Sequence, residues 1–140
     1  MPQFRTTRRI DGDYTLKEDK YKHFEDSVGA ICDFERRHYL YEMPYRTMVK
    51  TGFPNIITAG RCASGEGYGW DLMRVIPPAI ITGQAAGTVC AMAIDNGNNL
   101  FGFDINEFQN ELEKQNVIVH FDDSLVVQPE QDEHVDIGHI

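Results

Sequence analysis

Cysteine is scarce in this sequence, which has only Cys32, Cys62 and Cys90 among its 140 residues. A disulfide framework or a cysteine-based zinc site needs closely spaced pairs of cysteines, and these three are far apart. We therefore expect reduced thiols. Cys62 directly follows Arg61, and because no second cysteine is near it in sequence, we favour a packed thiol over a redox-active one.

The histidines are scattered as well. His23, His38 and His120 stand alone in the sequence, and His134 and His139 lie in a polar tail without convergent partners. A metal site that is visible in a sequence needs ligand residues at a characteristic spacing. We therefore assign these histidines no chemistry and expect no bound metal.

Positive charge is missing from most of the chain. The formal net charge is -9, and residues 51–140 hold three basic and thirteen acidic side chains. Such a chain repels phosphate backbones and anionic lipid, so we expect neither nucleic acid nor a membrane among its partners. A small basic cluster, Arg5, Arg8 and Arg9, is interpreted as a solvated face or a disordered start.

The N-terminal stretch MPQFRTTRR also lacks an apolar signal core. We therefore expect a cytoplasmic protein. Strand-like sequence begins almost at once after this stretch, which suggests a piece cut from a longer chain. The overall composition, 41% hydrophobic and 11% aromatic, is that of a folded domain. We place this domain at residues 1–127 and expect residues 128–140, which are polar, acidic and aperiodic, to form a disordered tail.

The first half of the chain predicts extended structure with interruptions. Residues 9–16 (RIDGDYTL) alternate in polarity and carry Asp-Gly, which favours an extended segment with a bend. The charged residues 17–25 indicate either a short helix or a loop. Residues 39–49 are rich in aromatic and extended-forming residues, and Pro44 limits any strand there to an edge or an interrupted one.

An apolar run and a glycine-rich loop follow. Residues 55–59 (NIITA) predict a buried strand of the parallel type, which is commonly followed by a loop and a helix. The loop carries Gly65, Gly67 and Gly69 in the pattern G-x-G-x-G, which does not complete the dinucleotide-binding fingerprint. We expect no helix to start within this loop and interpret it as a mobile cover rather than a phosphate cradle.

The longest apolar stretch runs from Ile76 to Ile94 and allows three interpretations: a membrane span, a core helix, or a helix whose first turn receives an anion. Its length is sufficient for a bilayer, but it contains Gln84, lacks an aromatic belt and has no basic cluster on its C-terminal side. We therefore favour a soluble helix. Pro77 and Pro78 indicate its start, because proline is tolerated in a first turn whose N–H groups have no intrahelical partners.

This helix is apolar on all sides, so we expect it to be buried all round. Ala79, Gly83 and Gly87 fall on one face, which would allow close approach of a sheet or a cofactor. Its first turn, preceded by Arg74, carries a partial positive charge and N–H groups that receive anions. Gly97 is placed to cap its C-terminal end.

Two further elements are predicted near the C-terminus. Asp104 and Glu107 have the spacing of a capping box, and Phe108 and Leu112 lie one turn apart, which indicates a helix that begins at Asp104. Residues 117–121 (VIVHF) predict a strand.

The order of the motifs YEMPYRTMV, NIITAGRCAS and RVIPPAIITGQAAGTVCAMA resembles the C-terminal part of the FAD-dependent oxidoreductases related to the fumarate reductase and succinate dehydrogenase flavoproteins. The upstream segments RRIDGDYTL and FEDSVG resemble the same family, so the similarity extends from Thr7 to Val117. It implies FAD as cofactor and a small-molecule substrate.

The resemblance also implies roles for particular residues. It places Gly60 and Arg61 beside the ribityl chain of FAD, and it directs the helix N-terminus at the pyrimidine edge of the flavin. The residues that would make backbone contacts there are Ile76, Pro77, Pro78 and Ala79. A helix dipole at that edge favours the charge that forms on reduction. The resemblance implies that Arg74 is a catalytic residue that binds a substrate carboxylate; a structural ion pair is the alternative.

The sequence departs from the family in three ways. The loop SGEGYGWDL has no histidine, and Pro78 replaces a residue that commonly carries a hydroxyl. The G-x-G-x-x-G unit and the strand with the ribose-binding acid, which hold the adenosine and pyrophosphate of FAD, are missing.

We therefore expect an α/β fold class: a C-terminal fragment of a three-layer FAD/NAD(P)-binding fold that lacks the N-terminal dinucleotide-binding βαβ unit. The full-length protein would be a FAD-dependent oxidoreductase, and the fragment alone would be inactive. Its partners would be the remainder of the flavoprotein and, through exposed surfaces, a second copy of itself by self-association. The alternative is a small non-catalytic binding or oligomerisation module.

Overall fold

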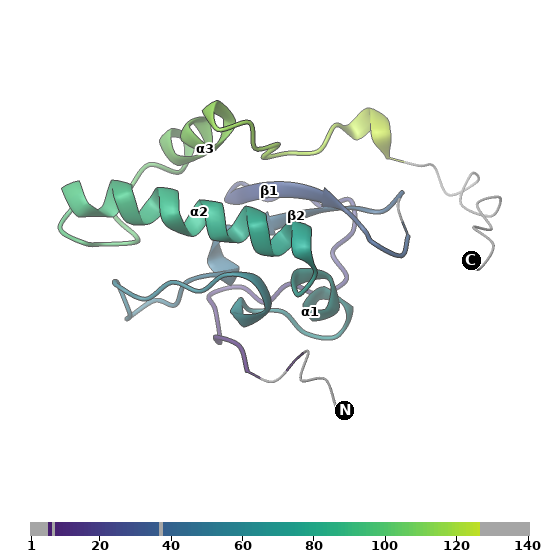
Figure 1. Ribbon diagram of the computed structural model, residues 1–140, viewed down its shortest axis with the longest axis horizontal. Coiled ribbons are helices and arrows are strands. Elements are labelled where there is room, and N and C mark those ends of the chain that lie inside the picture. The colour runs from purple at the N-terminus through teal and green to yellow at the C-terminus, as the bar shows by residue number, and fades with distance from the viewer. Residues whose placement is uncertain (1–5, 7, 37, 127–140) are drawn as a thin grey trace.

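A two-stranded hairpin and a long helix organise the chain (Figure 1). The computed structural model describes residue 6, residues 8–36 and residues 38–126, so the predicted tail at 128–140 lies outside the described residues. The elements in chain order are β1 (Ser27–Cys32), β2 (Leu40–Pro44), the 3-10 helices η1 (Tyr45–Thr47) and η2 (Gly60–Cys62), α1 (Tyr68–Met73), α2 (Ile76–Asp95), α3 (Ile105–Lys114) and η3 (Asp123–Leu125). The described part is therefore a mixed α and β structure, in which α2 contacts β1, η2, α1 and α3.

The hairpin pairs β1 and β2 antiparallel, with an irregularity between Ser27 and Ala30. We did not predict β1 from the sequence. We predicted that Pro44 limits a strand here to an edge or an interrupted one, and β2 ends at Pro44, because proline has no N–H to continue the ladder; η1 follows directly. Tyr41 and Met43 of β2 are fully buried, so the hairpin forms one wall of the core.

α2 begins and ends as the sequence predicts. Pro77 and Pro78 lie in its first turn, and Gly97 adopts a φ of 68° just beyond its last residue. The Asn98 N–H donates to the Ala93 carbonyl at 2.8 Å, which is the longer bond of a Schellman cap. A glycine fits this position because residues with a side chain rarely adopt a positive φ.

The expectation that α2 is buried on every side is wrong. Its buried residues form one face at helical spacing: Pro78, Thr82, Ala85, Val89 and Ala93. On the opposite side Ile76 and Ile80 expose 74% and 62% of their surface. The described elements cover only one side of α2. By length and composition α2 could also cross a membrane, and 28% of its apolar window is buried in this structure.

α3 confirms the predicted capping box in part. The Asp104 side chain accepts from the N–H groups of Asn106 and Glu107, which are otherwise unpaired in a first helical turn. Phe108 and Leu112 point into the core and are fully buried. α3 thereby packs against α2 and β1 through one apolar stripe.

Two predicted strands are absent from the described residues. Residues 55–59 make a single antiparallel bridge, Val49 to Ile57, and Ile56 is exposed, so this run is not a buried strand. Residues 117–121 lie beside β1, where the Ala30 N–H donates to the Ile118 carbonyl at 2.7 Å, but they form no ladder. A strand requires a partner along its length, and neither run has one here.

The glycine-rich segment differs from the expected mobile cover. Helix α1 starts at Tyr68, inside the segment where we expected no helix. A Cβ on Gly69 would collide with the backbone carbonyls of Leu16 and Lys17, so this glycine permits close chain packing. The Tyr68 hydroxyl donates to both carboxylate oxygens of the buried Asp33, each at 2.8 Å. These contacts fix the segment against residues 16–17 and against the loop of the hairpin.

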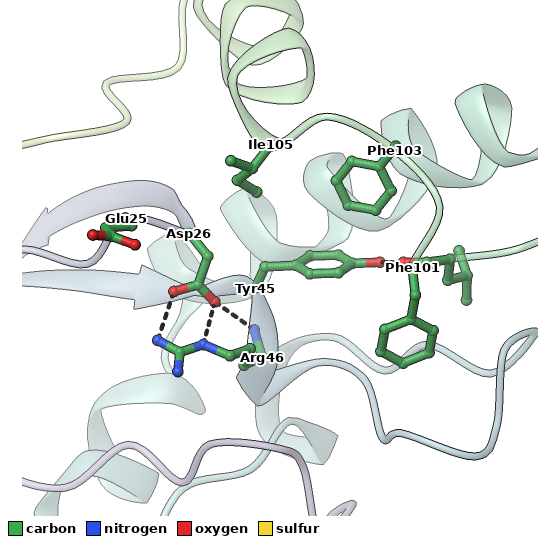
Figure 2. Close-up of a pocket in the computed structure, with 8 residues that line it drawn as sticks. Glu25, Asp26, Tyr45, Arg46, Phe101, Phe103 and Ile105 are labelled. Atoms are coloured by element: carbon green, nitrogen blue, oxygen red, sulfur yellow. Dashed lines mark hydrogen bonds and ion pairs between the residues drawn. The ribbon is translucent and has the colours of Figure 1, made fainter.

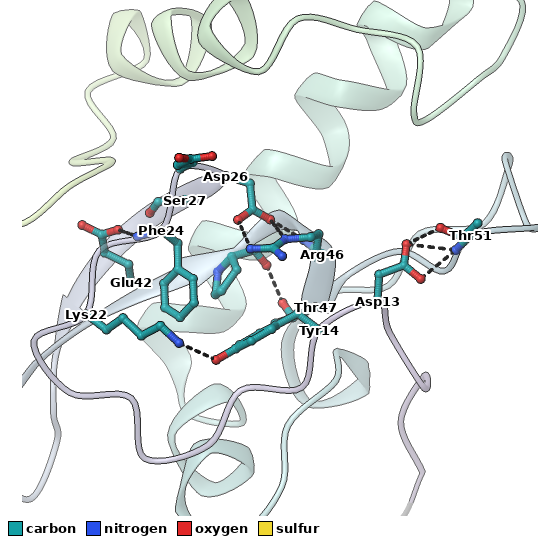
Figure 3. Close-up of polar contacts among 12 residues, drawn as sticks. Asp13, Tyr14, Lys22, Phe24, Asp26, Ser27, Glu42, Arg46, Thr47 and Thr51 are labelled. Carbon is teal, nitrogen blue, oxygen red and sulfur yellow. Dashed lines mark hydrogen bonds and ion pairs between the residues drawn. The ribbon is translucent and has the colours of Figure 1, made fainter.

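Residues 9–16 are extended and irregular, as predicted, and residues 17–25 form turns and loop rather than a helix. Asp13 holds the first of these segments by accepting from the Thr51 N–H at 3.0 Å and from its hydroxyl at 2.6 Å (Figure 3). Leu16 is fully buried at the end of this segment. The N-terminal residues therefore belong to the same core as the hairpin and α2.

Candidate functional site

The family resemblance implies that Gly60, Arg61 and residues 76–79 contact FAD, and the structure brings the two elements that carry them, η2 and the first turn of α2, together. Gly60 has a φ of 58°, and a Cβ built on it would lie 3.3 Å from the Cβ of Ala79. Such an approach leaves little room for any side chain at position 60. We refer to η2 together with residues 76–79 as the corner.

Thr82 ties the corner together and was not identified from the sequence. Its hydroxyl accepts from the Gly60 N–H at 2.8 Å and donates to the Pro78 carbonyl at 2.6 Å. The side chain is fully buried, so both bonds form away from water. A threonine four residues after Pro78 is the pattern that would have identified it, because threonine commonly bonds the carbonyl one turn earlier.

The first turn of α2 offers fewer donors than we expected. Pro77 and Pro78 have no N–H, and the Ala79 N–H donates to the Val75 carbonyl at 3.2 Å. Ile76 is the residue of this turn whose N–H no described backbone carbonyl accepts. The turn therefore combines one N–H group with the positive end of the helix dipole and an exposed apolar side chain.

An apolar surface extends from the corner along α2. It is formed by Ile76, Ile80, Gly83 and Gly87, which we call the open face. A Cβ on Gly83 or Gly87 would meet no atom within 4 Å. The predicted small face thus exists, but none of the described residues packs closely against its glycines.

The two predicted arginines lie on either side of α1. Arg74 pairs with Asp71, with 2.8 Å between Nε and Oδ1, and its side chain is 21% exposed. This contact corresponds to the structural alternative for Arg74, and substrate binding by Arg74 stays a prediction. Arg61 is exposed, and its carbonyl accepts from the Trp70 indole N–H at 2.9 Å.

Cys62 ends η2 and is exposed, as are Cys32 and Cys90. The expectation that Cys62 is a packed thiol is therefore wrong. η2 presents this thiol outward because its buried residue is Gly60. A redox role for Cys62 stays an open prediction.

A separate hollow of about 300 Å³ lies at the end of the hairpin (Figure 2). On one side Arg46 forms a two-point pair with Asp26, at 3.0 Å from each of two guanidinium nitrogens. On the other side the Tyr45 hydroxyl donates to the Leu100 carbonyl at 2.8 Å, and burial raises the pKa of Tyr45. The Arg46–Asp26 pair therefore joins the two ends of the hairpin, and the Tyr45 bond holds Leu100 against it.

Comparison with known families decides the assignment. The sequence model of the family described as FAD dependent oxidoreductase matches residues 1–112. The chain belongs to the FAD-dependent oxidoreductase family. Its cofactor is accordingly FAD. No curated protein and no solved structure matches the chain.

The corner fits one part of FAD. A diphosphate is held by several N–H groups of a glycine-rich turn at a helix start, and the two prolines of α2 remove two such donors. A flavin ring edge is flat, largely apolar and carries carbonyl acceptors. The exposed Ile76 side chain, the Ile76 N–H and the helix dipole suit that edge.

Proposed function

We propose that this chain is the C-terminal part of a FAD-dependent oxidoreductase related to the fumarate reductase and succinate dehydrogenase flavoproteins. In the complete protein the chain completes a three-layer FAD-binding fold, whose N-terminal βαβ unit holds the adenosine and pyrophosphate. The chain contributes η2, the start of α2 and Arg74 to redox chemistry on a small-molecule substrate. On its own it is inactive, because most of the binding energy for FAD comes from the pyrophosphate site.

The observation that supports this proposal most is the corner itself. Gly60 lies against Ala79 and is tied to α2 through Thr82, while the adjoining open face of α2 is apolar. A soluble domain rarely leaves a continuous apolar helix face in water, and such faces mark binding sites or interfaces. The rest of the FAD-binding domain is the partner that this face fits.

Each residue of the corner then has a physical task. FAD, when bound, supplies hydride transfer. The positive end of α2 and the Ile76 N–H stabilise negative charge that accumulates nearby. Gly60, which has no side chain, lets η2 lie against Ala79, and the backbone of Gly60 and Arg61 lies beside the ribityl chain. Arg74, held by Asp71, orients a substrate carboxylate.

The open face also supports a proposal for the isolated chain. Without its partner domain, we expect the chain to self-associate through Ile80 and its neighbours on α2. Analytical ultracentrifugation should show concentration-dependent association that Ile80→Lys reduces. The matched change Ile118→Lys, at a residue 69% exposed on another segment, should not reduce this association.

We further propose a cytoplasmic location for the protein and no nucleic-acid or membrane partner.

Flavin content tests the proposed function. The complete protein, purified without added cofactor, should be yellow and show a flavin absorbance band, whereas this chain alone should be colourless. A small binding or oligomerisation module would be colourless at any length. A colourless complete protein that also fails to take up added FAD would overturn the proposal.

A further inference from the structure

Glu42 is a carboxylate with no exposed surface, and two imidazoles converge on it. Its Oε2 accepts from the Phe24 N–H at 2.8 Å (Figure 3). Its Oε1 lies 2.6 Å from Nδ1 of His23 and 3.0 Å from Nδ1 of His120. A buried carboxylate requires strong partners, and here two of them are imidazole nitrogens, which are also the most common protein ligands of metal ions.

Three separate segments bring this cluster together. His23 precedes β1, Glu42 lies within β2, and His120 follows α3. The last of these segments is fixed to β1, because the Ser27 hydroxyl donates to the Val119 carbonyl at 2.6 Å. The ligand atoms of His23, Glu42 and His120 lie within 4.8 Å of one another. The backbone therefore holds the three groups in place independently of any ion.

A second layer of contacts orients His23. Its Nε2 lies 2.9 Å from Oδ1 of Asp123, and the Phe121 ring stacks on the imidazole with the centroids 4.1 Å apart. A histidine that binds a metal through one nitrogen commonly donates its other N–H to a carboxylate, and Asp123 takes that position.

We propose that His23, Glu42 and His120 bind a divalent first-row transition-metal ion, with zinc as the best fit. Two imidazoles and one carboxylate form a common three-ligand set for such an ion, with water filling the remaining positions. Both histidine side chains are 42% exposed, so the ion can enter and keep its water. This inference is independent of the flavin role of the corner.

Small side-chain movements complete the geometry. Bonds of about 2.0 to 2.2 Å in tetrahedral zinc place neighbouring ligand atoms about 3.4 Å apart. The imidazoles lie 2.6 Å (His23) and 3.0 Å (His120) from Oε1 of Glu42, so His23 must move away by about 0.8 Å and His120 by about 0.4 Å, which rotation of partly exposed rings allows. The alternative to a metal site is a cluster without an ion. In that arrangement His23 carries a proton on both ring nitrogens and donates to Glu42 and to Asp123.

Metal titration of the 140-residue chain distinguishes these two arrangements. The background chain carries His134→Gln and His139→Gln, so that the imidazoles of the tail do not contribute. After removal of metals with a chelator, it is titrated with ZnCl₂ by calorimetry and with CoCl₂ by visible absorption. We expect one zinc per chain and the absorption bands of a nitrogen- and oxygen-ligated cobalt ion.

Three variants locate the site. His120→Gln should weaken zinc binding at least tenfold, and Asp123→Asn should weaken it about tenfold by releasing the His23 ring. The control His38→Gln, at a histidine outside the cluster, should leave the affinity unchanged. Circular dichroism verifies that each variant is folded, which is expected because the replaced side chains in the cluster are partly exposed. Absence of zinc binding, or equal affinity of His120→Gln and its parent, would overturn the proposal.

Discussion

At the scale of single residues, Gly60 is the position where the corner depends most on a missing side chain. Its φ of 58° is one that L-residues rarely adopt, and a Cβ there would press on Ala79 at 3.3 Å. Gly97, at the end of α2, shares the positive φ but has no atom within 4 Å of such a Cβ. Substitution of each glycine therefore distinguishes two contributions to the free energy of unfolding: strain from the backbone conformation, which both positions share, and crowding, which only Gly60 has.

We expect Gly97→Ala to lower the free energy of unfolding by about 1 to 2 kcal/mol, because a residue with a side chain is strained at this φ. Gly60→Ala should cost more, because α2 must also shift away from η2. Chemical denaturation of both variants measures the difference. Equal decreases in the free energy of unfolding of the two variants would show that the close contact between Gly60 and Ala79 does not affect stability.

Asp104 gives a residue-scale prediction about pH. Hydrogen bonds from the N–H groups of Asn106 and Glu107 hold the pKa of Asp104 below its ordinary 3.8. Its stabilising effect on α3 is therefore present above pH 3.8 and is lost as the pH falls through the lowered pKa. The melting temperature of Asp104→Ala should fall below that of the unaltered chain at neutral pH, and the gap should narrow in acid. A gap that stays constant down to pH 2 would contradict this assignment.

At the scale of elements, α3 depends on its apolar stripe. Leu112 is fully buried, so Leu112→Ala should lower the free energy of unfolding by about 2 to 5 kcal/mol through lost burial and a cavity. Glu113→Ala, on the exposed side of the same helix, should change it by less than about 0.5 kcal/mol. Denaturation curves of the two variants provide the test. Similar small losses in both would mean that α3 does not pack as described.

The elements that the sequence predicts correctly are those determined by local chemistry. Proline fixes where β2 ends and where α2 begins, Gly97 provides the C-terminal cap, and Asp104 caps α3. These effects act within a few residues of the chain, so they can be predicted without knowledge of the tertiary structure.

The elements predicted wrongly depend on partners elsewhere. Residues 55–59 and 117–121 have strand-like composition, but a strand forms only where another strand completes its hydrogen bonds. β1 was missed because Gly29 interrupts its pattern, and the reason for that glycine is non-local: a Cβ there would collide with Ile81 of α2. Composition does not reveal such a contact.

At the scale of the whole molecule, the family resemblance implies that Gly60, Arg61 and residues 76–79 serve one cofactor, and the structure shows η2 in contact with the first turn of α2. The sequence does not predict that Thr82 joins η2 to α2, or that two prolines leave so few N–H donors in the first turn of α2. The cluster of His23, Glu42 and His120 was missed because its members are spread over almost the whole described chain. Only the fold brings such distant residues together.

The exposed side of α2 is the largest departure from the predicted burial and supports the central claim of the account. Ile76 and Ile94 lie at opposite ends of this helix and are 74% and 69% exposed. If the N-terminal end faces the flavin in the complete protein, a charge at position 76 acts on the flavin, and a charge at position 94 lies about five helical turns, or about 27 Å, further along the helix.

The midpoint potential of the bound flavin in the complete protein tests this claim most directly. Ile76→Lys should raise the potential by on the order of tens of millivolts, because a positive charge at that end favours the electron-rich reduced state. The matched variant Ile94→Lys should leave the potential unchanged. If both variants retain FAD and their potentials equal that of the unaltered protein, the N-terminal end of α2 does not face the flavin.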